Sequence, residues 1–143
     1  MLENTWAASP AATGSRQESP ALGDPDSPVD LVHLARQCQS DPGLEEELLG
    51  LFTPLARSLA AQISDPQMRL EPKANIAHKL RGSALAIGAG RVAVAAGAIE
   101  DIARSARGGD VPEEAQTRAA ARAIAALQAA VAEAIAHIER LRR

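Results

Sequence analysis

The sequence predicts an all-α protein: an antiparallel four-helix bundle with a short extra helix at its N-terminal end. Alanine, the strongest helix former, supplies 32 of the 143 residues. Trp6 and Phe52 are the only aromatic residues, whereas sandwiches and barrels need many aromatic and β-branched side chains. Apolar residues recur at steps of three and four along several stretches, which is typical of helices with one face toward a core.

Composition also narrows the classes of function. The length allows one ordinary domain. With 15 basic and 18 acidic residues the formal charge is −3, so no overall basic field would attract a nucleic acid, and exposed rings that could stack on single strands are lacking. Cys38 is the only cysteine, which excludes an intrachain disulfide and a thiolate metal cage. The first residues lack a secretory signal pattern, and we therefore expect a cytoplasmic protein.

One small, apolar stretch, residues 82–99, could be mistaken for a membrane span. Arg91 lies in its middle, and Gly88 and Gly90 interrupt it. Alanine and glycine also bury too little area to drive insertion into a bilayer. We expect no membrane association, and interpret the small residues as a means of close helix packing.

The N-terminal part of the chain divides into a tail and two helices. Residues 1–27 show no helical or alternating period and are expected to be a disordered tail, with the bundle over residues 28–143. Ser27-Pro28 predicts the N-cap and first position of a short helix. Asp41-Pro42 repeats this signal for a second helix that runs to about residue 64, with a kink at Pro54.

Three further helices complete the predicted bundle. The third opens near Pro72 and runs to Gly88, and the fourth runs from near Gly90 to the glycine pair at 108–109. The fifth covers about residues 111–141. Its apolar residues lie at steps of three and four, as a core-facing stripe requires; they are Ile124, Leu127, Val131, Ile135, Ile138 and Leu141.

Among the three histidines, His78 is distinguished by its position on the third helix. At about 100° per residue, Leu80 and the other apolar side chains of this helix fall opposite His78, so the imidazole is expected to face solvent. Gly82, one turn further on, costs about 1 kcal/mol relative to alanine in a helix. A glycine at this costly position indicates that another molecule must approach the imidazole of His78 closely. His33 and His137 have no companions at ligand spacing, and we expect no metal site.

The segment around His78 is basic within a net-acidic protein. Residues 72–99 contain no Asp or Glu, but they contain Lys73, Lys79, Arg81 and Arg91. A neutral imidazole is a competent nucleophile, and phosphoryl transfer needs mainly positioning and compensation of the phosphate charge. This pattern indicates a histidine that carries a phosphoryl group.

Residues 77–88, with the sequence AHKLRGSALAIG, resemble the signature of histidine phosphotransfer (HPt) domains. That signature has a histidine, an apolar residue two positions on, a lysine three on and a glycine four on, followed by two small residues and an apolar-glycine pair. The resemblance extends over roughly residues 29–141. It implies a four-helix bundle whose His78 is the phosphoacceptor, exchanging phosphoryl groups with the aspartate of response-regulator receiver domains.

The resemblance also implies roles for the neighbours of His78. Arg81 stands where the family usually has lysine and would neutralise the phosphate, with Lys79 as a second candidate. Gly82 would provide steric clearance. Leu85 falls on the His78 face, and together with Ala89 it is expected to form a small apolar docking surface.

The same resemblance defines the expected partners. A receiver domain, a hybrid histidine kinase or both would bind this protein, which we expect to be monomeric. The receiver would supply the aspartyl phosphate and Mg²⁺, so no cofactor or metal of the chain's own is expected. The chain is also too short to include an ATP-binding domain, and no autonomous kinase activity is expected.

Two other functions stay open at this point. The bundle could be a helical adaptor that binds a receiver or kinase domain without carrying phosphate. It could also be an enzyme that uses His78 as a general base. The second alternative is disfavoured because such a base normally needs an orienting carboxylate, and residues 72–99 supply none.

Overall fold

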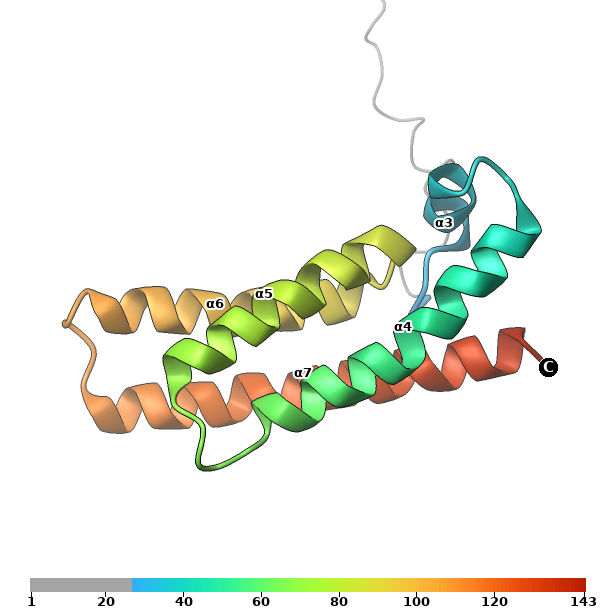
Figure 1. The fold of residues 1–143 in the computed structure, drawn as a ribbon. Helices are drawn as coiled ribbons and strands as arrows, with labels where there is room; N and C mark the ends of the chain where they lie inside the picture. The colour runs from blue at the N-terminus through green and yellow to red at the C-terminus, as the bar shows by residue number, and fades with distance from the viewer. Residues whose placement is uncertain (1–26) are drawn as a thin grey trace, which may run out of the picture.

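The computed structural model describes residues 27–143 and shows five α-helices and no strand within this range (Figure 1). The helices are α3 (Leu31–Gln37), α4 (Pro42–Ile63), α5 (Leu70–Ile87), α6 (Gly90–Arg107) and α7 (Glu113–Leu141). The predicted all-α class is confirmed. The predicted disorder of the tail falls on residues that lie outside this range, apart from Ser27.

The four long helices pack as an antiparallel bundle. α5 packs against α6, α6 packs against α7, and α4 contacts both α5 and α7. Figure 1 shows the α4–α5 and α6–α7 connections at one end of the bundle, and α3, the α5–α6 connection and the C-terminus at the other. Alanine supplies 13 of the 28 buried hydrophobic residues in the described range, and Leu80, Ile99 and Leu127 are fully buried among the larger ones.

Two of the five described helices, α3 and α4, begin with an aspartate side chain as the cap, whereas α5, α6 and α7 have no side-chain cap hydrogen bond. The Asp41 carboxylate accepts hydrogen bonds from two backbone N–H groups at the start of α4, as expected. At α3 the cap is Asp30, and the prediction of a start at Ser27-Pro28 is wrong by three residues. Ser27 instead donates its hydroxyl to the carbonyl of Val29 at 2.7 Å.

Other boundaries lie close to their predicted positions. α4 continues through Pro54 to Ile63. α5 begins at Leu70, two residues before the predicted Pro72, and α6 ends at Arg107, directly before Gly108. These small shifts leave the predicted order of helices unchanged.

Gly88 joins α5 to the N-terminal helix as well as ending α5. Its φ of +83° is in the left-handed region, which favours glycine. Its carbonyl accepts a hydrogen bond from the Asp30 N–H at 2.9 Å. Nearby, Nε2 of His33 donates to the Leu85 carbonyl at 2.8 Å. α3 is therefore fastened to the C-terminal end of α5.

One helix in the described part of the chain, α7, is long and apolar enough to cross a membrane. Length and composition alone do not distinguish a membrane span from a core helix, and α7 packs against α4 and α6 in the bundle. The stretch 82–99 that resembles a span in sequence is divided between α5 and α6.

Candidate functional site

His78 lies on the outward face of α5, about halfway along the helix. Its side chain is 69% exposed, whereas Ala77 and Leu80 are fully buried. The expectation that the imidazole faces solvent is confirmed. The physical cause is the apolar stripe of α5, which packs toward the core and turns His78 away from it.

The carboxylate of Glu100, on α6, contacts the imidazole ring. Its Oε2 lies 2.7 Å from Nδ1 of His78, and its side chain is only 16% exposed. Because a carboxylate accepts and does not donate, this contact places a proton on Nδ1. Nε2 then has a free lone pair in the neutral ring, and no described residue forms a hydrogen bond to it.

The contact with Glu100 overturns one expectation from the sequence, that no carboxylate accompanies His78. Glu100 lies one position beyond the segment 72–99, which contains no Asp or Glu. A signal was present, because His78 and Glu100 each lie 11 residues from Ala89. In an antiparallel helix pair, positions equally far from the connection lie at the same level, so the hairpin itself brings these two residues together.

Arg81 completes a three-residue network. Its Nε lies 2.9 Å from Oε1 of Glu100 and forms an ion pair with it. The N–H is not aligned for a hydrogen bond, and Oε1 is buried without a hydrogen-bond partner among the described residues. The stem of Arg81 passes over Gly97, where an added Cβ would lie 3.6 Å from Cδ of Arg81. The arginine predicted to neutralise phosphate thus also bridges α5 to α6 and positions the carboxylate that binds the imidazole.

The other two predicted residues beside His78 lie in open surroundings. Lys79 is exposed, with no ion pair to any residue in the described range. Gly82 is also exposed, and a Cβ built there would meet nothing within 4 Å. The space beside the imidazole ring is therefore clear. Close packing against another helix does not account for a glycine at position 82.

Leu85 and Ala89, predicted together as a docking surface, separate in the structure. Leu85 is 53% exposed, but Ala89 is fully buried. The prediction that Ala89 extends an exposed patch is wrong, because the chain reverses direction at Gly88 and the helical periodicity of α5 does not continue past it. Ala89 packs in the core at the start of α6.

The described residues contain no group of three or more His, Cys, Asp or Glu side chains placed to hold a metal ion. Cys38 is buried, and desolvation raises the pKa of its thiol above the ordinary value. This cysteine is accordingly a small core residue and not a reactive thiolate.

Comparison with known proteins identifies the family. Curated proteins and solved structures give no significant match. The family model described as "Hpt domain" matches residues 43–141, about two thirds of the chain, and this range includes His78, Arg81 and Glu100 but not α3. Hpt domains are the histidine-containing carriers of two-component phosphorelays, are generally soluble, and interact with receiver domains and histidine kinases. The chain belongs to the Hpt domain family.

Proposed function

We propose that this protein accepts a phosphoryl group on Nε2 of His78 and passes it to or from the aspartate of a response-regulator receiver domain. One observation supports this most strongly: the exposed imidazole is held through Nδ1 by Glu100, which leaves Nε2 available to a partner. We propose further that the protein acts as a cytoplasmic monomer, with a receiver domain or a hybrid histidine kinase as its partner.

In the proposed transfer, the lone pair on Nε2 of His78 attacks the phosphorus of an aspartyl phosphate. An N–P bond forms, the P–O bond to the aspartate breaks, and the aspartate leaves as a carboxylate with the bonding electrons. Nδ1 retains its proton and its hydrogen bond to Glu100, which favours the positive charge that develops on the ring. The reverse sequence returns the phosphoryl group to a receiver.

The cations and the metal have separate roles in this proposal. Lys79 and the guanidinium of Arg81 compensate the charge of the phosphoryl group on the carrier side. Mg²⁺ belongs to the receiver domain and binds there together with the phosphorylated aspartate. The carrier needs only to present its imidazole to that site.

A second candidate, a general base, gains support from the same contact. A histidine that is hydrogen-bonded to a carboxylate is the usual arrangement of a general base. A base also needs an adjoining substrate site, whereas the His78 side chain is mostly exposed. The carrier is therefore the better interpretation, and covalent labelling distinguishes the two.

The test is incubation of the protein with a ³²P-labelled receiver domain or with a hybrid kinase and labelled ATP. A carrier acquires label that is labile to acid and stable to alkali, as expected of a phosphoramidate. A general base would acquire none. Binding to the receiver without label from any donor would support the adaptor and contradict the carrier.

Substitution of Glu100 by alanine is expected to slow phosphoryl transfer by about ten- to a hundredfold. A hydrogen bond to a charged group contributes about 1.5–3 kcal/mol, and each 1.4 kcal/mol is tenfold in rate. Glu100→Gln keeps an acceptor for Nδ1–H and should recover part of the rate. The matched control is Asp101→Ala, which removes the neighbouring exposed carboxylate. Single-turnover rates measure the effect, and equal rates for Glu100→Ala and Asp101→Ala would exclude the positioning role.

Substitution of Arg81 by alanine is expected to slow transfer about tenfold while changing the affinity for the receiver less than threefold. The reason is that Arg81 both compensates phosphate charge and holds Glu100. Lys79→Ala is the comparison, because it removes a cation that makes no contact with Glu100. An unchanged rate in Arg81→Ala with a slowed rate in Lys79→Ala would transfer the phosphate role to Lys79.

Substitution of Leu85 by aspartate is expected to weaken receiver binding about tenfold with little effect on the rate at saturating receiver. The exposed leucine lies two turns from His78 on the same face of α5. Leu51→Asp, at an exposed leucine on α4, serves as the control. Titration by calorimetry measures both, and wild-type affinity in Leu85→Asp would remove this residue from the docking surface.

A further inference from the structure

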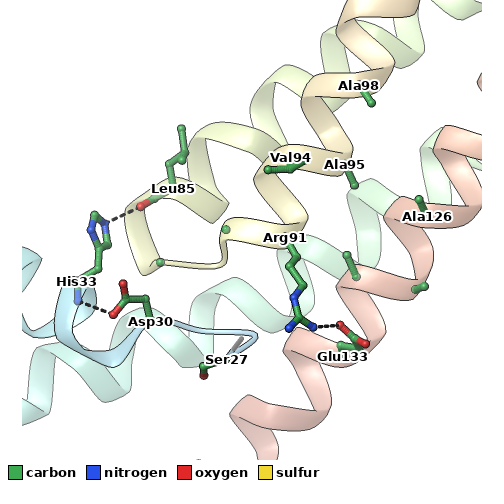
Figure 2. Close-up of a pocket in the computed structure, with 14 residues that line it drawn as sticks. Ser27, Asp30, His33, Leu85, Arg91, Val94, Ala95, Ala98, Ala126 and Glu133 are labelled. Carbon is green, nitrogen blue, oxygen red and sulfur yellow. Dashed lines mark hydrogen bonds and ion pairs between the residues drawn. The ribbon is translucent and has the colours of Figure 1, made fainter. Parts of the chain in front are cut away.

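A groove lies at the α3 end of the bundle, with α6 and α7 forming its walls (Figure 2). It has a volume of about 940 Å³, and five of its 14 lining residues are alanines of these two helices. Leu85 and Val94 are its large apolar side chains, and an ion pair of 2.9 Å joins Arg91 of α6 to Glu133 of α7 across it. No step of the proposed phosphoryl transfer uses this groove.

The apolar surface of the groove is exposed to an unusual degree. Val94 is 76% exposed, more than any other large apolar side chain in the described range, and Leu85 is 53% exposed. Two such side chains fall well short of the roughly 800 Å² per partner that a stable protein dimer buries. The groove therefore fits a short segment of chain better than it fits a second folded copy.

The chain itself provides such a segment at the edge of the groove. Ser27, the first described residue, is among the residues that line it. Its hydroxyl oxygen lies 3.5 Å from Nε2 of His137 on α7 and also donates to the Val29 carbonyl. The 26 preceding residues thus connect to the bundle directly at this groove. An extended chain covers about 3.3 Å per residue, so Leu22 can lie up to about 17 Å from Ser27.

Charge does not decide which segment occupies the groove. Residues 1–26 contain one basic and four acidic residues and so carry the whole formal charge of −3. The charged residues that line the groove are Asp30, Arg91 and Glu133, and Arg91 is already paired with Glu133. The attachment at Ser27 and the exposed apolar side chains of the groove, and not charge attraction, select residues 20–26 as the occupant.

We propose that residues 20–26 occupy the groove between α6 and α7, with Leu22 placed against Val94. Residues 20–26 contain too few apolar side chains to fold by themselves. Docking of the single Leu22 side chain into an existing groove does not require the segment to fold. Attachment at Ser27 gives the segment an effective concentration on the order of millimolar. A contact too weak to form between separate molecules is then well populated.

Docking would also affect the phosphotransfer surface, an extension that rests on the proposed function. Leu85 belongs to both the groove and the candidate receiver-docking face. Residues 20–26 would therefore compete with a receiver domain for this side chain. Deletion of residues 1–26 is expected to raise receiver affinity about two- to fivefold. An unchanged affinity would refute the competition between residues 20–26 and the receiver domain.

The test of docking is a comparison of backbone amide NMR spectra, which does not depend on phosphoryl transfer. Leu22→Asp in the full chain is expected to shift the amides of Val94, Ala98 and Ala129. The matched control is Leu2→Asp, which makes the same chemical change far from Ser27 and should leave these amides in place. Val94→Asp, at a side chain too exposed to be needed for folding, should in turn shift the amides of residues 20–26.

Two outcomes would overturn the proposal. Shifts from Leu22→Asp confined to residues near position 22 would show that the groove is not occupied by this segment. Shifts at Val94 and Ala98 that grow with protein concentration in the wild type would assign the groove to a second copy of the chain.

Discussion

Substitution of His78 by glutamine is expected to abolish phosphoryl acceptance, with a loss of at least about a thousandfold. The imidazole Nε2 is the nucleophile in the proposed step, and a glutamine amide nitrogen has no comparable lone pair. The fold should be retained, since the His78 side chain is 69% exposed. Acid-labile, alkali-stable label after incubation with a phosphorylated receiver domain measures the loss.

The matched control for this substitution is His137→Gln. His137 lies on α7, near Ser27 and away from the α5 surface that bears His78, and its replacement should leave labelling at the wild-type level. Circular dichroism verifies that both variants are folded. Equal labelling of His78→Gln and the wild type would place the phosphoacceptor elsewhere, and the carrier role of His78 would have to be abandoned.

Substitution of Gly88 by alanine is expected to lower the free energy of unfolding by about 2–4 kcal/mol. A non-glycine residue in the left-handed region costs about 1–2 kcal/mol. In addition, the new Cβ would lie 2.8 Å from the Asp30 carbonyl oxygen, closer than any normal contact, and that atom belongs to backbone and cannot move freely. Relief of the contact would separate α3 from the end of α5, so the Asp30–Gly88 hydrogen bond would also weaken.

Urea denaturation followed by circular dichroism measures the effect of Gly88→Ala. The control is Gly90→Ala, two residues away, where a Cβ meets nothing within 4 Å and φ is not positive. That variant should change stability by less than about 1 kcal/mol. A loss of less than about 0.5 kcal/mol in Gly88→Ala would show that α3 is not held against this turn as described.

The helix boundaries illustrate how far local sequence signals reach. Asp41 caps α4 as predicted because its carboxylate bonds to N–H groups two and three residues away, a contact that depends only on nearby residues. At α3 the local signal of Ser27-Pro28 misplaced the start. The observed cap is Asp30, whose backbone N–H also bonds to the Gly88 carbonyl, which is remote in sequence.

The candidate site also combines features that depend on residues near in sequence with features that depend on how the helices pack. The exposure of His78 and the open space at Gly82 follow from the periodicity of one helix, and both were predictable from the sequence. The burial of Ala89 and the contact of Glu100 with His78 were not predicted, because both depend on how α5 and α6 pack after the turn.

The sequence by itself thus determined an all-helical chain, the order of its helices, and one histidine directed to solvent among basic residues. These properties arise from propensities and periodicities that act within a few turns of helix. Only the tertiary structure decided which carboxylate holds His78, that Arg81 binds this carboxylate, and that a groove remains beside Ser27. Each of these depends on the distance and rotation between packed helices, which side chains throughout the core set jointly.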